Sequence, residues 1–286
     1  MTLYKVLIVG AGGMLATDVE SSLSPAFMVT VLTKAQLDIT NRDAVFKAIT
    51  SIKPDVLINT AAYTNADECE EKQGTALLVN GTAVGYLAQA AQAIGARIIH
   101  ISTDYIFDGN KGSAYVEDDK PNPLSVYGQS KLVGEQELKR YTDNYTIIRT
   151  QWMFGEHGNN FVETIVRLAR ETAELKVVDD QFGSPTYTRD VAGIIKWFVE
   201  HDQVKGQVFH FSNEGIVSRF GFALEILKLA GIKTKLLPVD TSAFPRPAQR
   251  PHNTTLDKAK IKQVTGMSIR PWQEALYEYL KNTGNL

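Results

Sequence analysis

The stretch Val9-Gly10-Ala11-Gly12-Gly13-Met14-Leu15-Ala16 decides the fold of this 286-residue chain. It follows an apolar run at 6–9 that is typical of a buried strand, and it opens a segment at 15–23 with helical periodicity. Glycines permit positive φ and let a phosphate approach the backbone, while the first N–H groups of a helix attract an anion. We therefore predict a dinucleotide-binding turn rather than an ordinary strand-to-helix turn, with Gly10, Gly12, Gly13, Met14 and Leu15 at the cofactor.

Strands and helices alternate through the first half of the chain. Short apolar runs predict strands at 6–9, 29–32, 56–59, 98–102 and 146–149. Helical patterns lie between them at 15–23, 42–51, 76–94 and 130–141. This alternation indicates an α/β fold with a doubly wound parallel sheet of the Rossmann type, with helices on both faces.

The pattern changes after about residue 150. Helices are expected at 160–171, 189–201, 220–230, 256–264 and 272–281, strands at 175–178 and 207–212, and a structured proline-containing loop at 241–253. We predict a dinucleotide-binding domain over 1–150 and a smaller C-terminal α/β substrate domain over 151–286. Some segments of the second part are expected to return to the Rossmann domain, with a cleft between the two parts.

Composition narrows the class of protein. A net charge of −2 gives no electrostatic footprint for nucleic acid, and no apolar run is long enough to cross a bilayer. Cys69 is the single cysteine, which excludes an intrachain disulfide and suits a reducing compartment, so we expect a cytoplasmic protein. The five histidines show no paired metal spacing, and we expect no metal site. Asp67, in an acidic segment, is a further candidate for the cleft.

The end of the second strand bears on cofactor choice. NAD sites usually carry an acid there for the ribose 2′-hydroxyl, but this chain reads Val31-Leu32-Thr33-Lys34. A hydroxyl and an ammonium suit a 2′-phosphate, which favours NADPH, with NADH as the alternative. Lys34 is nearly as well explained as a solvated surface lysine. Asp38 and Ile39 are candidates to flank the adenine.

Tyr127 and Lys131 are the candidate catalytic pair. Four residues apart on a helix, they share one face, and an ammonium beside a tyrosine is expected to lower its pKa. The Tyr277 and Lys281 pair has the same spacing, but it lies far from the glycine turn in sequence, and we interpret it as part of an amphipathic helix. Thr103 follows a predicted central strand, where ligands of α/β sheets bind, so its hydroxyl can bond a ketone oxygen that Tyr127 protonates.

These motifs together resemble the dTDP-4-dehydrorhamnose reductase family of extended short-chain dehydrogenases/reductases. The matching runs span nearly the whole chain in family order: Gly10–Ala16, Asn59–Thr64, Ser102–Gly109, Tyr127–Lys131, Ile148–Trp152, Asp180–Thr186 and Arg250-Pro251 with Asn253. Two positions depart from the family pattern, Ala16 in place of glycine and Gln151 in place of a small residue before the tryptophan.

The resemblance implies a role for each matching residue. It makes Thr103, Tyr127 and Lys131 catalytic, and it adds Ala61, Ala62 and Thr64 to the cofactor site. It places Asp104, Tyr105 and Trp152 at the sugar and Arg250 near the nucleotide diphosphate, where a guanidinium fork suits phosphate.

The implied activity is NADPH-dependent reduction of the C4 ketone of dTDP-4-dehydro-β-L-rhamnose, in nucleotide-sugar and cell-surface polysaccharide biosynthesis, by a monomer or homodimer. Alternatives are a reductase or epimerase acting on another 4-keto-6-deoxy nucleotide sugar, and a non-catalytic NADP-binding regulatory subunit. Tyr105 stands where dehydratases commonly carry an acid, which argues against dehydration.

Overall fold

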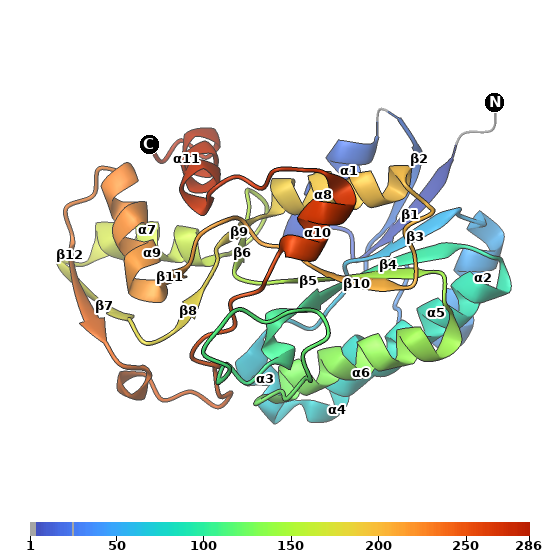
Figure 1. Ribbon diagram of the computed structural model, residues 1–286, viewed down its shortest axis with the longest axis horizontal. Coiled ribbons are helices and arrows are strands. Elements are labelled where there is room, and N and C mark those ends of the chain that lie inside the picture. The colour runs from blue at the N-terminus through green and yellow to red at the C-terminus, as the bar shows by residue number, and fades with distance from the viewer. Residues whose placement is uncertain (1–3, 25) are drawn as a thin grey trace.

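A six-stranded parallel sheet forms the larger part of the molecule (Figure 1). The computed structural model describes residues 4–24 and 26–286. The sheet order is β10-β5-β4-β3-β1-β2, and every pair in it is parallel. Its strands are β1 (Lys5–Val9), β2 (Met28–Leu32), β3 (Val56–Asn59), β4 (Arg97–Thr103), β5 (Tyr145–Thr150) and β10 (Gln207–His210).

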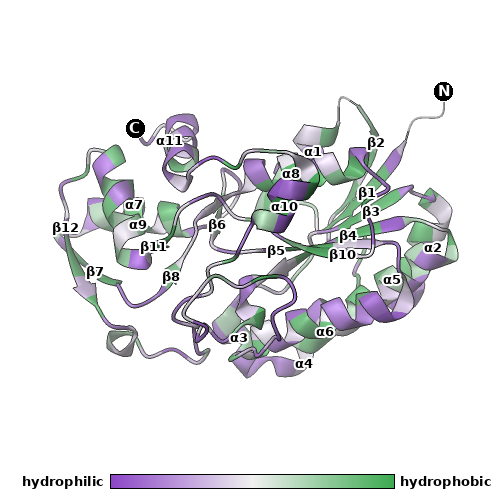
Figure 2. Cartoon of the chain, viewed as in Figure 1, coloured by the Kyte–Doolittle hydropathy of each residue, from purple (hydrophilic) through white to green (hydrophobic). Residues whose placement is uncertain are grey.

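Helices cover both faces of this sheet, as the Rossmann prediction requires. One face packs on α1 (Met14–Leu23), α8 (Thr188–Glu200) and α10 (Ala259–Thr265). The other packs on α2 (Arg42–Ile52), α5 (Ala83–Ala93) and α6 (Val126–Tyr141). Figure 2 shows hydrophobic residues along the central strands and mixed colours on the helices, because each helix buries only one side. The doubly wound fold is thus confirmed.

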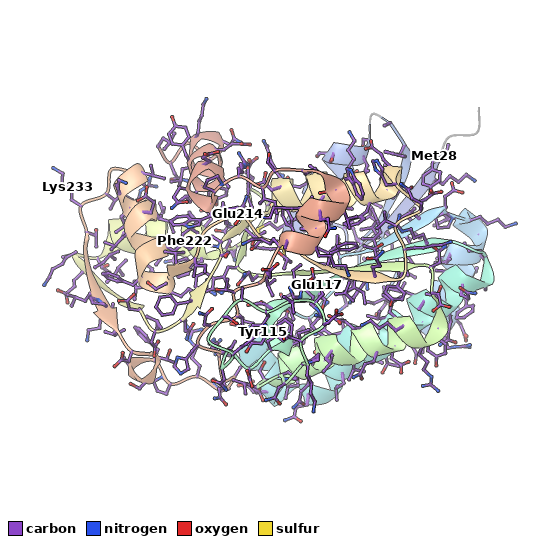
Figure 3. All side chains as sticks on the ribbon, viewed as in Figure 1. Met28, Tyr115, Glu117, Glu214, Phe222 and Lys233 are labelled. Carbon is purple, nitrogen blue, oxygen red and sulfur yellow. The ribbon has the colours of Figure 1, made fainter. Side chains whose placement is uncertain are left out.

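The C-terminal lobe has its own core. Its helices are α7 (Phe161–Glu171), α9 (Arg219–Leu229) and α11 (Trp272–Asn282), and its strands are β6 (Met153–Phe154), β7 (Glu174–Val178), β8 (Phe182–Gly183), β9 (Thr186–Tyr187), β11 (Val217–Ser218) and β12 (Lys235–Val239). Phe222, labelled in Figure 3, is fully buried in this core. Three segments after residue 150 belong to the larger sheet instead, since β10 pairs with β5, α8 packs on α1 and α10 packs on β10. A domain boundary at 150 stays a prediction.

The predicted helix at 76–94 is interrupted. It divides into α4 (Gln73–Leu77), a π-helical turn at Leu78–Thr82 and α5, after the short helix α3 (Ala66–Glu71). In the π turn, the Asn80 amide accepts from Tyr63 N and donates to the Tyr63 carbonyl and to Ser130 Oγ. The turn therefore fastens the loop after β3 to α6, a contact between distant segments that helical periodicity does not reveal.

Two other predicted helices have different starts. α6 begins at Val126 rather than 130, because Ser125 caps it by accepting from Gly128 N at 3.2 Å. α10 begins at Ala259 rather than 256, because Leu256 forms a parallel bridge with Tyr115. Short 3-10 turns at Asp104–Ile106 and Thr241–Ala243 complete the described elements.

Candidate active site

The glycine turn lies where the strand order reverses, between β1 and β3. Gly10 and Gly12 have φ of 91° and 86°, in the left-handed region. A Cβ on Gly10 would stand 2.5 Å from the backbone nitrogen of Ala61, so only glycine fits this close approach. Ligands of open α/β sheets bind in the crevice at such a reversal.

Helix α1 begins at this turn without a side-chain cap. Its N-cap is Gly13, whereas Asn41, Ser125 and Asn160 cap α2, α6 and α7 through their side chains. The first-turn N–H groups of α1 are therefore available to an anion, at the positive end of the helix dipole. Leu15 itself points into the core, so only its backbone can serve a ligand.

The residues beyond β2 are held in a local turn. Gln36 accepts from the backbone N–H of Thr33 at 2.9 Å and from its hydroxyl at 3.0 Å. Asp38 accepts from the Thr40 hydroxyl at 2.7 Å, and this bonding, led by the Thr40 backbone N–H, lowers the pKa of Asp38. Ile39 belongs to the core, while Lys34 is exposed. Lys34 thus presents a cation beyond the strand end, and Asp38 and Ile39 have structural partners of their own.

The loop after β3 faces the same crevice. Asn59 Oδ1 accepts from Ala61 N at 3.0 Å, and Thr60 Oγ1 donates to the Val9 carbonyl at 2.8 Å. These bonds tie the predicted cofactor residues Ala61 and Ala62 to the end of β1, next to Gly10. Thr64 lies further along and lines the cleft described below.

Tyr127 and Lys131 lie on one helix, α6, where Lys131 is buried and Tyr127 is half-buried and lines the cleft described below. Burial raises the pKa of Tyr127 well above its usual value, and a hydrogen bond with the Thr103 side chain only partly opposes this. The prediction that Lys131 lowers this pKa is wrong for this structure. Burial dominates, because the phenolate is the form that loses its hydration, and the charge of Lys131 is not among the main influences on this pKa.

Lys131 belongs to a buried charged network. Its ammonium donates to the Ile101 carbonyl at 2.5 Å, and burial lowers its pKa to about 8, with Glu135 acting in the opposite direction. Glu135 accepts from Arg149 at 2.9 and 2.8 Å and from Ser102 Oγ at 2.6 Å. The cation at Lys131 is therefore supported by a carboxylate one helical turn away.

A cleft of about 1620 Å³ runs between the sheet edge and the C-terminal lobe. Its lining includes eight of the predicted site residues: Met14, Thr64, Thr103, Asp104, Tyr105, Tyr127, Trp152 and Arg250. It brings the candidate acid and the candidate sugar residues together. Lys131 lies beneath it, buried against β4.

Asp104 is a buried carboxyl without an ion pair within 4 Å in the described residues. Thr103 Oγ1 donates to it at 3.1 Å and Thr254 Oγ1 also donates to it. Burial raises its pKa to about 6 despite these bonds. In this structure the Thr103 hydroxyl proton is therefore directed at Asp104.

Trp152 has φ of 45°, a left-handed conformation that is costly for a bulky residue and is found at ligand sites. The guanidinium carbon of Arg219 lies 3.5 Å from the centroid of its indole ring. One face of the indole is therefore covered by protein. A sugar ring can use only the remaining face or edge.

Arg250 is bound by the protein itself. Its guanidinium donates to both Asp67 oxygens at 2.8 Å, and Ala248 N also donates to Asp67. The bond with Arg250 lowers the pKa of Asp67 to about 2. In Figure 1 the long loop after β12 reaches α3, and this ion pair joins the two sides of the cleft there.

Sequence reasoning did not find Arg219, Glu135, Arg149 or Thr254. Arg219 follows Ser218, a recognisable helix cap, but no motif distinguishes it from a surface arginine. The second tyrosine–lysine pair is separate from the site, since Tyr277 on α11 is 51% exposed. In residues 4–24 and 26–286 no group of three His, Cys, Asp or Glu side chains is arranged to hold a metal ion. No helix in that part is long and apolar enough to cross a bilayer.

Hydride transfer to or from a dinucleotide is the chemistry that this sheet edge serves. The fold and site define an NAD(P)H-dependent oxidoreductase. Residues 4–285 match the RmlD substrate binding domain family. The chain belongs to this family, which is that of the dTDP-4-dehydrorhamnose reductases, as the resemblance predicted.

Relatives match over almost their full length. The chain is 42% identical to a dTDP-4-dehydrorhamnose reductase of Aggregatibacter actinomycetemcomitans, covering 95% of this chain and 97% of the relative. The crystal structure of a dTDP-4-dehydrorhamnose reductase from Clostridium acetobutylicum superposes with a TM-score of 0.95 at 41% identity, covering 98% and 99%. That from Bacillus anthracis, solved in complex with NADP, gives 0.95 at 35% identity, covering 98% and 100%.

Proposed function

We propose that this protein reduces the C4 ketone of dTDP-4-dehydro-β-L-rhamnose to the alcohol of dTDP-β-L-rhamnose, with NADPH as the reductant. The observation that carries the proposal is the meeting of Thr103, Tyr127 and the cleft residues Asp104, Tyr105 and Trp152 at the carboxyl edge of β4 and β5. The relatives named as this reductase, and the one in complex with NADP, support the same reaction.

The residues of the glycine turn fit a dinucleotide. The positive φ of Gly10 and Gly12 and the uncapped start of α1 make a backbone cradle for a pyrophosphate. Lys34, exposed beyond β2, suits the 2′-phosphate that distinguishes NADPH from NADH. Lys131 would hold the nicotinamide ribose. When bound, NADPH supplies the hydride that is added to the ketone carbon.

The side chains of the cleft stabilise the negative charge that develops on the ketone oxygen and supply the proton that this oxygen takes up. As the ketone oxygen becomes negative, Tyr127 donates its phenolic proton to it, and the raised pKa of Tyr127 keeps that proton in place until then. Thr103 turns its hydroxyl from Asp104 to the same oxygen and stabilises the negative charge.

The test is oxidation of NADPH, followed by its absorbance, with the dTDP-4-keto sugar as substrate. Wild-type protein is expected to turn over, and Tyr127→Phe is expected to bind NADPH normally and lose most of kcat. The Tyr277→Phe variant, in the exposed pair on α11, is the matched control and should retain full turnover. Wild-type protein that binds NADPH tightly but oxidises none with any 4-keto nucleotide sugar would refute the proposal and favour a regulatory subunit.

The location and assembly belong to the same proposal. A cytoplasmic location is supported by the presence of a single cysteine, which forms no disulfide within the chain. The enzyme is proposed to act as a monomer or homodimer.

A further inference from the structure

Two guanidinium groups line the cleft beside Tyr105, and they differ in how they are bound. The Arg250 guanidinium is occupied, because it donates to both oxygens of Asp67 and to the Ala248 carbonyl. Arg219 has no carboxylate within 4 Å among the residues that the structure describes. A partly buried cation without a counter-ion is costly, and such a group in a cleft indicates an anionic ligand.

The position of Arg219 is fixed from both ends. It is the first residue of α9, its backbone N–H donates to the Gln181 carbonyl at 3.1 Å, and Ser218 caps the helix by accepting from Gly221 N at 2.9 Å. Its guanidinium carbon lies 3.5 Å from the Trp152 ring centroid and 5.2 Å from that of Phe161. Stacking uses the faces of the guanidinium plane, so its N–H edges can bind oxygen in that plane, as the side-chain hydrogen bond with Tyr105 does.

The acids near Arg219 are bonded to other groups. Burial lowers the pKa of Arg219, and the charge of Arg250 lowers it as well. Asp104 acts on Arg219 in the opposite direction, but it is bonded to two threonine hydroxyls. Asp180, another acid of the cleft, accepts from the Thr241 backbone and hydroxyl instead. Arg219 is therefore a cation of the cleft to which none of these carboxylates is bonded.

The location agrees with the length of the substrate. Arg219 stacks on Trp152 and interacts electrostatically with Tyr105. The ring centroid of Tyr105 lies 5.7 Å from that of Tyr127, the proposed acid at C4. In a nucleoside-diphosphate sugar the diphosphate is attached at C1, across the ring from C4. A sugar with its C4 at Tyr127 thus brings its diphosphate to within a few ångströms of this neighbourhood.

We propose that Arg219, rather than Arg250, is the principal ligand of the substrate diphosphate, and that Arg250 acts mainly by joining its loop to Asp67. The inference rests on the proposed function, since it assumes a nucleoside-diphosphate sugar in the cleft. It moves a role that the resemblance gave to Arg250 onto a residue outside every motif. Trp152 is accordingly a platform for both the arginine and the sugar.

The experiment measures binding of dTDP and of thymidine to the NADP-loaded protein by calorimetry. Arg219→Gln is expected to weaken the binding of dTDP at least tenfold, or by about 1.4 kcal/mol. The affinities for thymidine and for NADPH should stay within twofold of wild type. Arg219→Lys keeps the charge but not the forked guanidinium, so its affinity for dTDP should lie between those of wild type and Arg219→Gln. Arg167→Gln, at an exposed arginine of α7 paired with Glu171, is the matched control and should change nothing.

The outcomes separate the two proposals. Suppose that wild-type protein reduces the 4-keto sugar. If Arg219→Gln then binds dTDP with unchanged affinity, or if its affinity for thymidine falls as much as that for dTDP, the role of Arg219 is refuted and the reductase function stands. If wild-type protein binds no dTDP, both are refuted. A selective loss of dTDP in Arg219→Gln, partly restored in Arg219→Lys, supports the inference.

Discussion

The buried pair of Glu135 and Arg149 allows a quantitative prediction. Glu135 is 1% exposed and Arg149 is 3% exposed, and two hydrogen bonds of 2.9 and 2.8 Å join them. Glu135→Gln keeps the shape but leaves Arg149 as a buried cation without its carboxylate. Removing one partner of such a pair costs about 3–5 kcal/mol, and we expect about 3 kcal/mol because the amide oxygen still accepts one bond.

The assay is equilibrium urea unfolding followed by tryptophan fluorescence. Glu137→Gln is the matched control on the same helix, since Glu137 forms a surface pair with Arg140 at 3.5 Å, and it should lie within about 0.5 kcal/mol of wild type. A loss below about 1 kcal/mol in Glu135→Gln, or an equal loss in Glu137→Gln, would refute the reasoning.

The same substitution should alter the pH dependence of turnover. Lys131 is protonated below its pKa of about 8, so in wild type the reductase rate should fall as the pH rises through about 8. Glu135 favours the ammonium form, so its neutralisation should move that fall to lower pH. An unchanged profile in Glu135→Gln would show that the carboxylate does not act on Lys131.

Three more outcomes are expected. Gly10→Ala should lower the free energy of unfolding by at least about 2 kcal/mol and weaken NADPH binding in a fluorescence titration, because its Cβ would meet Ala61 at 2.5 Å. A Cβ on Gly12 would meet nothing within 4 Å, so Gly12→Ala should lower the free energy of unfolding by only about 1 kcal/mol. Gln151→Met should raise the free energy of unfolding by about 1–2 kcal/mol, since both amide atoms of Gln151 are buried without a partner in the described chain; a lower stability would contradict this. Asp67→Asn should lower the free energy of unfolding by about 2 kcal/mol at pH 6 but by little at pH 2. The pKa of Asp67 is depressed in the folded state, so its ionised form stabilises the fold above pH 4, and this contribution disappears as the pH falls to about 2. If Asp67→Asn lowered the free energy of unfolding equally at both pH values, the ionised Asp67–Arg250 pair would be excluded as the cause.

The sheet was predictable because each central strand is a continuous apolar run. β1, β3 and β5 are buried on both faces, so composition alone marks them, and helices with one apolar face mark the layers. The strand β12 was not predicted, since it contains Pro238 and is only partly buried. The π turn at Leu78–Thr82 was missed for a different reason, because the contacts of Asn80 come from other segments.

The site was predictable where a local motif encodes the chemistry. Thr103 and Tyr127 lie in motifs, and the structure brings both to the cleft. The direction of the Tyr127 pKa was not predictable, because it depends on how deeply α6 and the lobe bury the phenol. Arg219 was not predictable either, since its importance comes from Trp152 beneath it and from the carboxylate that Arg250 has and it lacks.

The return of β10 to the large sheet has a consequence for synthesis of the chain. The sheet edge at β5 is complete only when residues 207–210 have left the ribosome, after the segments of β6 to α8 have already emerged. Until then β5 is an open edge strand, which is prone to pair with other chains. A released fragment that ends at residue 150 should therefore aggregate or recruit chaperones, and a released fragment that ends beyond residue 210 should be protected.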